Sequence, residues 1–293
     1  MHEELLQQLN SLLATLGAQD VDKAALINNA KKLAGEKAVN DHVLAVYPRD
    51  RGMVVGLGTG STAFFAIQRV GYLWTNGYLR DLKCIPTSKE TYDIASRLRI
   101  PLITLDDLGQ DEVVDVTIDG ADAVDARMNL IKGGGGALLR EKMVEMASKK
   151  FICIVDEGKM CLQLGPSFAL PVEIVQFCHQ HTIKQILKIS QLRGCIPVLR
   201  TGTVSNNKII NEDDPPAITD NGNYIVDIHF PQRKFIQDPS RLAADLKSIV
   251  GVVEHGLFCG MVHQLIVATN KGTTRVYGTA TPSEYTPPFR PWP

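Results

Sequence analysis

The sequence predicts an α/β fold in which a parallel sheet is followed by a smaller α+β unit. Three apolar runs predict strands, because each ends in a polar or glycine-rich turn: residues 53–56 lead into GLGTGST, 113–118 into DGAD and 151–155 into DEGK. Helix-like stretches follow them at residues 63–78, 89–99 and 137–150. Strands that alternate with helices are typical of a parallel sheet whose two faces are covered.

The two ends of the chain depart from this pattern. Leucines recur at spacings of three and four over the first twenty residues, which predicts an appended helix, and helix-like sequence continues to residue 45. The tail, residues 281–293, contains five prolines and suits neither a regular helix nor a central strand. We expect it to form an extended arm.

A second unit is expected after residue 164. Short apolar segments alternate there with helix-like segments, in the order 171–177, 182–192, 223–230 and 239–249. The last apolar run, 264–268, is expected to return to the main sheet. We therefore expect a larger domain of residues 1–165 plus 255–293 and a smaller α+β domain of residues 166–254.

The composition excludes several classes of protein. Of 293 residues, 44% are hydrophobic and 22% are charged, as in globular proteins rather than collagen-like or disordered chains. Lys and Arg number 31 against 32 for Asp and Glu, so the chain lacks the basic surplus of a nucleic-acid or anionic-membrane binder. We expect neither partner, and no apolar run is long enough to span a membrane.

The N-terminus and the cysteines favour a cytoplasmic protein. Glu3 and Glu4 stand where a secretory signal carries Lys or Arg, and the first twenty residues contain no arginine. The six cysteines are scattered without a C-x-x-C pair, as expected of reduced thiols.

The first candidate site is the glycine-rich turn GLGTGST. Alternating glycines from Gly56 to Gly60 let the backbone turn tightly, and Ser61 and Thr62 precede a predicted helix. Backbone N–H groups, hydroxyls and a helix N-terminus suit a phosphate. The turn matches neither the dinucleotide fingerprint nor the Walker A motif. A tight turn capped by Ser61 is the alternative.

The second candidate is DGAD, at the end of a predicted strand. Gly120 and Ala121 are small and leave room beside Asp119, and Asp122 follows. The carboxyl ends of parallel strands open into ligand crevices, where two carboxylates could move protons or bind sugar hydroxyls. Helix capping by Asp122 or a turn made by Asp119 is the alternative.

The third candidate is KGGGGALLREK. Four consecutive glycines are costly to order, which indicates that something approaches the backbone closely after Lys132. If a helix begins near Ala137, Glu141 lies on it near the glycines, and we expect its side chain to face a solvent-filled cleft. The alternative is a flexible connector with Glu141 and Lys142 as solvated charges.

Other polar residues carry weaker signals. Lys159 follows the third strand at the same sheet edge, although surface lysines are common there. Lys31 could reach a phosphate, but a solvated helix face is the more common role. His179 and His181 suggest zinc, yet no second ligand pair at suitable spacing accompanies them, and we expect no metal.

The ordered set GLGTGST, DGAD, KGGGGALLRE and VDEGK resembles type A ribose-5-phosphate isomerase. The resemblance extends to ALPVEIV, TDNGNYIVDIHF and GVVEHGLF, and so covers roughly residues 30–275. It departs from the family at Ala123, where a glutamate is usual, and at Gly158, where serine is common. The segment 70–85 matches poorly.

The resemblance implies a Rossmann-like domain with a smaller α+β domain inserted into it. It also implies an aldose–ketose isomerase that interconverts D-ribose 5-phosphate and D-ribulose 5-phosphate through an enediolate. That reaction belongs to the non-oxidative pentose phosphate pathway and uses neither a metal nor an organic cofactor. We expect a homodimer or homotetramer.

The family's site residues fall on specific positions of this chain. Glu141 would be the base, Asp119 would move protons between O1 and O2, and Lys132 would face the developing oxyanion. The substrate-binding positions would be Thr59, Gly60, Ser61, Thr62, Asp119, Gly120, Ala121, Asp122, Lys132, Gly133, Gly134, Gly135 and Lys159. Lys31 matches a family lysine near the phosphate.

Two other functions compete with this interpretation. Related folds serve as sugar-phosphate sensors in regulators, but the balanced charge offers no DNA-binding module, and both Glu141 and Lys132 are present. Another phosphosugar isomerase or a lactonase of similar fold is the second alternative.

Overall fold

The computed structural model describes residues 25–48, 51–110, 112–202, 214–269 and 271–278. The helix expected over the first twenty residues and the proline-rich arm lie outside these ranges. Within them, no helix is long and apolar enough to cross a membrane.

The main sheet has six strands in the order β13-β12-β6-β3-β1-β2. The strands are β1 (Met53–Leu57), β2 (Leu82–Pro86), β3 (Val116–Asp119), β6 (Phe151–Asp156), β12 (Gln264–Ala268) and β13 (Thr274–Gly278). All neighbours pair in parallel except β12 and the edge strand β13. The parallel sheet and the return of 264–268 to it are confirmed.

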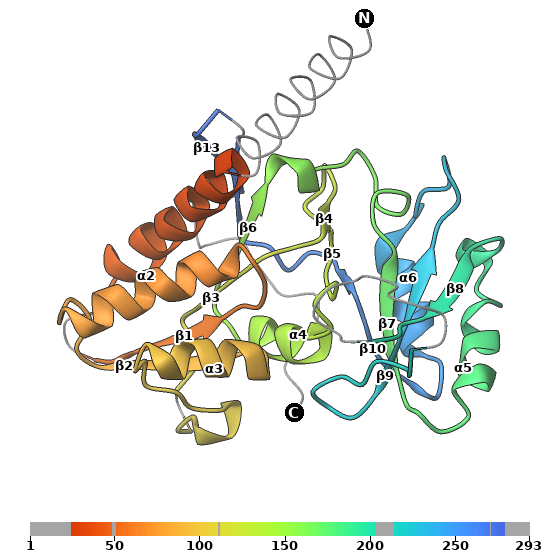
Figure 1. Ribbon diagram of the computed structural model, residues 1–293, viewed down its shortest axis with the longest axis horizontal. Helices are drawn as coiled ribbons and strands as arrows, with labels where there is room; N and C mark the ends of the chain where they lie inside the picture. Colours follow the sequence, from red (N-terminus) through yellow and green to blue (C-terminus); the bar gives the residue numbers. More distant parts are fainter. Residues whose placement is uncertain (1–24, 49–50, 111, 203–213, 270, 279–293) are drawn as a thin grey trace, which may run out of the picture.

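Helices cover both faces of this sheet (Figure 1). The helical residues 25–39, which continue as a π-helix at Asn40–Leu44, share one apolar core with α2 (Ala63–Thr75) and α3 (Lys89–Arg97). Helix α4 (Leu138–Met146) packs on the opposite face, where Val144 joins a separate apolar cluster. It ends four residues before the expected boundary, leaving a short turn before β6.

A second, antiparallel sheet has the order β10-β7-β9-β8. Its strands are β7 (Leu170–Ile174), β8 (Ile196–Leu199), β9 (Tyr224–His229) and β10 (Val252–His255). Helices α5 (His179–Ile186) and α6 (Pro239–Lys247) share its apolar core. The helix expected over 182–192 is divided, because a 3-10 turn at Ser190–Leu192 follows α5. The domain boundaries near 165 and 255 stay a prediction.

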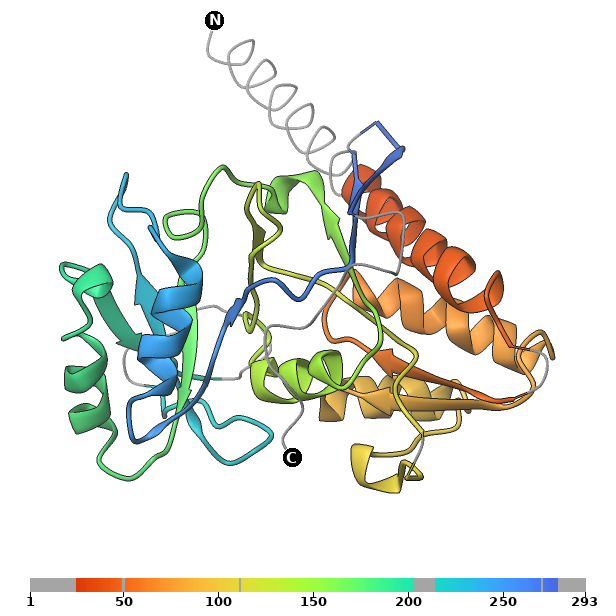
Figure 2. The ribbon, with the colours of Figure 1, turned by 180° about the vertical axis from the view of Figure 1, so that it is seen from behind.

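A small three-stranded sheet, β11-β5-β4, connects these two parts. Strand β5 (Leu130–Ile131) pairs antiparallel with both β4 (Ala123–Val124) and β11 (Leu257–Phe258). Because β10 leads directly into β11, the second sheet is tied to the segment that enters the glycine run. Helix α4 lies between the two larger sheets in both views (Figures 1 and 2).

The strand order places the candidate site. Read as parallel strands, the sheet runs β2-β1-β3-β6-β12, so the chain moves outward from β1 to β2 and then returns to β3. Loops after β1 and β3 diverge at this switch point, where open α/β sheets bind ligands beyond the carboxyl ends of the strands. GLGTGST begins in the last two residues of β1, and DGAD begins at the last residue of β3.

Candidate active site

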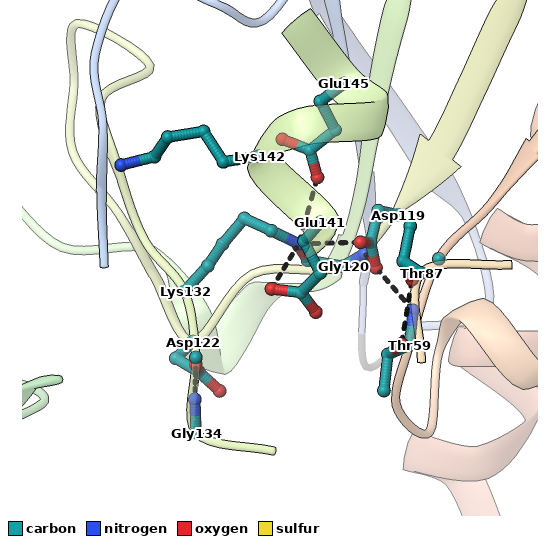
Figure 3. Close-up of polar contacts among 12 residues, drawn as sticks. Thr59, Thr87, Asp119, Gly120, Asp122, Lys132, Gly134, Glu141, Lys142 and Glu145 are labelled. Carbon is teal, nitrogen blue, oxygen red and sulfur yellow. Dashed lines mark hydrogen bonds and ion pairs between the residues drawn. The ribbon is translucent and has the colours of Figure 1, made fainter. Parts of the chain in front are cut away.

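Lys132 lies at the centre of a buried group of carboxylates (Figure 3). Its Nζ atom donates a hydrogen bond to the Gly120 carbonyl at 2.6 Å. The same atom lies 2.9 Å from Asp119 Oδ2, 3.2 Å from Glu145 Oε1 and 3.6 Å from Glu141 Oε2. Burial opposes the charge on Lys132, but the three carboxylates together raise its pKa well above the ordinary value.

Asp119 is held rigidly at the end of β3. Its Oδ1 atom accepts hydrogen bonds from the backbone N–H of Thr59 at 3.0 Å and of Gly120 at 2.6 Å. A Cβ atom on Gly58 would lie 2.2 Å from that same oxygen, so only glycine allows this approach. The glycine turn therefore holds Asp119, a candidate catalytic residue, in place and also presents backbone N–H groups.

Glu141 lies in the first turn of α4, with 7% of its side chain exposed. The expectation that it faces a solvent-filled cleft is wrong, because Glu141 is buried, on a helix that lies between the two larger sheets. Burial raises the pKa of Glu141 to about 8, although Lys132 lowers it; Asp119 and Asp122 raise it further. The carboxylate is therefore more basic than a solvated glutamate.

The close approach predicted from the four glycines is made by Asp122. Its Oδ2 atom accepts a hydrogen bond from the backbone N–H of Gly134 at 2.7 Å, and a Cβ atom on Gly134 would lie 2.7 Å from Oδ1. Burial raises the pKa of Asp122, while this hydrogen bond and the charge of Lys159 oppose the rise. No helix begins at Asp122, since β4 follows it, so the capping alternative is wrong.

The glycine turn after β1 is exposed at its tip. Gly60 and Ser61 are exposed, and Ser61 Oγ accepts a hydrogen bond from Lys31 Nζ at 3.0 Å. The turn is not capped by Ser61, because Thr62 is the N-cap residue of α2 and its side chain makes no capping bond. Lys31 thus lies beside the turn rather than on a purely solvated helix face.

Thr59 joins this turn to the start of α3. Its hydroxyl lies 2.8 Å from the Thr87 hydroxyl, 2.9 Å from Ser88 Oγ and 3.1 Å from the Thr91 hydroxyl. Ser88 is the N-cap of α3 and accepts a bond from the backbone N–H of Thr91. Hydroxyl groups from two loops therefore meet at the switch point.

Lys159 lies half-buried in the 3-10 turn that follows β6. Its Nζ atom is 5.9 Å from the centre of the Phe168 ring, and its charge acts on Asp122. The loops after β1, β3 and β6 and the glycine run after β5 thus bring the expected residues to one edge of the main sheet.

Comparison with known proteins decides the family. The profile of Ribose 5-phosphate isomerase A (phosphoriboisomerase A) matches residues 83–272. The chain belongs to this family. It is therefore a ribose-5-phosphate isomerase, and the sensor and lactonase alternatives receive no support.

Individual relatives match the isomerase over most of their length. Probable ribose-5-phosphate isomerase 1 of Arabidopsis thaliana is 46% identical over 245 residues, which cover 83% of this chain and 86% of the relative. Ribose-5-phosphate isomerase A of Bacillus mycoides is 44% identical over 244 residues, covering 83% and 97%.

Solved structures agree in fold. Ribose 5-phosphate isomerase from Plasmodium falciparum superposes with a TM-score of 0.76 at 38% identity and covers 87% of this chain and 100% of that one. A D-ribose-5-phosphate isomerase in complex with phospho-erythronic acid gives a TM-score of 0.72 at 34% identity, covering 86% and 99%. The Rossmann-like α/β fold is confirmed.

Arg200 contacts the candidate site of the isomerase, although its sequence pattern does not indicate this. It lies after β8 in the second sheet, where Asp227 holds its guanidinium by two bonds of 2.8 and 2.6 Å. Its Nη1 atom donates to the carbonyls of Gly133 and Gly134 at 3.0 and 3.1 Å. Arg200 therefore shapes the glycine run from a segment about seventy residues away.

The CHQH segment of the isomerase is remote from this chemistry. The His179 ring packs edge-on against Tyr224, 5.3 Å between centres. Over the described ranges of the chain, no group of three or more His, Cys, Asp or Glu side chains is arranged to hold a metal ion.

Proposed function

We propose that the enzyme interconverts D-ribose 5-phosphate and D-ribulose 5-phosphate through an enediolate, with Glu141 as the base that carries a proton between C1 and C2. The observation that carries this proposal is the Glu141 carboxylate, buried 3.6 Å from the ammonium of Lys132. A base and a cation at that separation can act on neighbouring atoms of one substrate.

The basicity of Glu141 suits the reaction. A carbon acid beside a carbonyl gives up its proton slowly, and an ordinary carboxylate is a weak base. Burial raises the pKa of Glu141 to about 8, which lies near neutral pH, where a general base combines availability with proton affinity.

Lys132 and Asp119 serve the oxygen atoms in this proposal. As the proton leaves carbon, negative charge develops on the neighbouring oxygen, and the fixed ammonium of Lys132 stabilises it without reorganisation. Asp119, 2.9 Å from the same ammonium, would move a proton between O1 and O2. Its rigid bonds to Thr59 and Gly120 keep it in position for that exchange.

The remaining loops would bind the substrate. The phosphate would lie at Thr59–Thr62, with Lys159 nearby, because exposed N–H groups, hydroxyls and ammonium groups suit a dianion. Asp122 and the segments Gly120–Ala121 and Gly133–Gly135 would bind the sugar hydroxyls. A relative solved with phospho-erythronic acid supports a phosphorylated sugar chain as the ligand class.

Several properties stay predictions. No cofactor is proposed, and the pathway is the non-oxidative pentose phosphate pathway. A cytoplasmic location and a homodimeric or homotetrameric assembly belong to the same set of expectations.

Isomerisation in D₂O tests the enediolate. Proton transfer through a carboxylate base allows solvent deuterium to enter at C1 of ribulose 5-phosphate and C2 of ribose 5-phosphate over prolonged equilibration. NMR spectra of the recovered sugars should show this label. Complete retention of carbon-bound hydrogen would instead indicate a direct hydride shift and would contradict the role of Glu141.

A further inference from the structure

Helix α4 supplies a second carboxylate that the proposed reaction does not use. Glu145 lies one helical turn after Glu141, so both side chains reach Lys132 from the same face of α4 (Figure 3). The side chain of Glu145 is fully buried, and its Oε1 atom lies 3.2 Å from Lys132 Nζ.

The protein offers the carboxyl group of Glu145 few polar contacts. Among the residues that the structure describes, its Oε2 atom has no hydrogen-bond partner, and the approach to Lys132 is the polar contact of its Oε1 atom. The surroundings of Lys132 are aromatic, with the centres of the Phe258 and Phe151 rings 5.5 and 5.9 Å from its Nζ atom. A well-packed apolar residue would serve stability as well or better here, which points to another role for Glu145.

The balance of charge assigns Glu145 a proton. One ammonium, Lys132, faces the carboxyl groups of Asp119, Glu141 and Glu145, with the Cys153 thiol and the Lys142 ammonium also close enough to interact. Burial raises the pKa of Glu145 well above its ordinary range, although the charge of Lys132 lowers it. The charges of Asp119 and Glu141 raise it further. A fully buried carboxyl group crowded by two others, with an Oε2 atom that lacks a hydrogen-bond partner, favours the neutral form, and the Oε1 atom of that form still faces Lys132 Nζ at 3.2 Å.

The ammonium of Lys132 has three protons and four oxygens around it. Gly120, Asp119 and Glu145 provide the three nearer oxygens, at 2.6, 2.9 and 3.2 Å, and Glu141 is the farthest at 3.6 Å. We propose that Glu145 is a positioning residue, which as a neutral acid anchors Lys132 and so keeps the ammonium from pairing tightly with the base Glu141. This inference rests on the proposed role of Glu141.

Removal of the anchor has a definite chemical consequence. Gly120 and Asp119 still occupy two protons of Lys132, so without the Glu145 oxygen the third proton turns toward Glu141, the one remaining oxygen of the four. A tighter ion pair lowers the pKa of Glu141 and makes it a weaker base toward carbon. If Glu145 were ionised instead, removing its negative charge would also lower the pKa of Glu141. The direction of this shift is therefore the same for either state of Glu145.

Two substitutions separate anchoring from charge. Glu145→Met fills the space but offers no oxygen, and we expect kcat to fall at least about tenfold while KM changes less than about threefold. The acidic limb of the kcat/KM profile, which reports the base in the free enzyme, should move to lower pH. Glu145→Gln keeps a neutral carbonyl oxygen, so its kcat should stay within about threefold of the parent.

Glu112→Met is the matched control, because it removes an exposed carboxylate that pairs at 2.7 Å with Lys83, near the start of β2 and away from the carboxyl ends of the strands where the site lies. Its kcat and pH profile should match those of the parent. An unchanged kcat and pH limb in Glu145→Met would overturn the proposal, as would a Glu145→Gln variant as impaired as Glu145→Met.

A measurement on the unmodified enzyme covers the case in which Glu145→Met does not fold. Carboxyl ¹³C NMR, assigned with Glu145→Gln, should show Glu145 protonated at pH 7, and an ionised group would overturn the proposal. Failure of the proposed function can be distinguished from failure of this inference. In that case the parent enzyme would be inactive on ribose 5-phosphate, or a Glu141→Gln variant would have normal activity.

Discussion

At the residue scale, Glu141 illustrates how position changes the chemistry of a common side chain. A glutamate in the first turn of an exposed helix is an ordinary solvated charge. In α4 the same residue is buried beside Lys132, and burial raises its pKa to about 8. A base of that strength is useful in proton transfer from carbon, but its ionised form is costly to bury.

Glu141→Gln should abolish most of the activity. The amide keeps the shape and reach of the side chain but cannot accept the proton, and the loss of a positioned base costs on the order of 10²–10⁴ in kcat, roughly 3–5 kcal/mol. A substrate analogue should bind with little change in calorimetry, because the phosphate loop is untouched. Near-normal kcat would transfer the role of base to Asp119.

The same substitution should stabilise the protein above neutral pH. The folded-state pKa of Glu141 is raised to about 8 from an ordinary 4.5, so the folded state binds the extra proton and stability falls as pH rises between these values. Glu141→Gln removes this pH-dependent loss of stability, because an amide does not ionise. Urea unfolding at pH 9 should show a gain of at least about 1 kcal/mol over the parent, shrinking toward pH 5. A gain that does not depend on pH would disprove the linkage.

At the element scale, the turn between β1 and α2 has two roles. Its tip is exposed and carries Ser61 beside Lys31, as suits an anion. Its base is buried, and there the Thr59 N–H and the absent side chain of Gly58 hold Asp119. In the proposed function, one short segment therefore couples substrate binding to the residues that move protons.

Gly58→Ala should damage catalysis more than folding. The new methyl group would lie 2.2 Å from Asp119 Oδ1, so the carboxylate or the turn must move. A displacement of about 1 Å in a catalytic group can cost on the order of 10²-fold in kcat/KM. Gly109→Ala is the control, since its added Cβ meets only ordinary contacts of 3.5 Å or more. Equal kcat/KM values for the two variants would show that Asp119 does not require its present position.

Free ribose should be a far poorer substrate than ribose 5-phosphate. Binding energy from the phosphate at the Thr59–Thr62 turn aligns the sugar for proton transfer, so its loss reduces kcat as well as affinity. We expect kcat/KM to drop by at least about 10²-fold in a coupled assay. Comparable kcat/KM values for the two sugars would contradict the assignment of the phosphate to this turn.

At the scale of the whole molecule, the site depends on contacts between the two larger sheets. Arg200 reaches from the second sheet to the glycine run, and Lys142 of α4 donates to Glu254 Oε1 at 2.8 Å and to the His255 carbonyl at 2.7 Å. Burial lowers the pKa of His255 to about 3, so its ring is neutral and adds no repulsion toward Lys142 at neutral pH. These contacts hold the glycine run before α4 and the middle of α4 to the second sheet.

Exhaustive chelation should leave the activity intact. The proposed chemistry uses a carboxylate and an ammonium for the tasks that a metal performs in other enzymes. Dialysis against EDTA, followed by the coupled assay, should give at least about 90% of the starting rate, because Lys132 supplies the positive charge. Activity that is lost and then restored by a divalent ion would refute this mechanism.

The sequence by itself determined the parallel sheet and the loops that carry the site. Apolar strands alternating with helices, and turns rich in Gly and Asp after them, follow from local periodicity and backbone conformation. The ordered motifs also placed Asp119, Lys132 and Glu141 in one family pattern. Such features need no knowledge of which segments meet in space.

Only the tertiary structure decided the environment of those residues. Desolvation and Coulomb interactions depend on distance in space, so the basicity of Glu141 could not be deduced from a solvated-cleft picture. For the same reason Glu145 and Arg200 escaped notice: one resembles any helix glutamate, and the other lies in a different sheet from the glycines that it contacts. Their contacts with the candidate site arise when folding brings charges together and removes water from them.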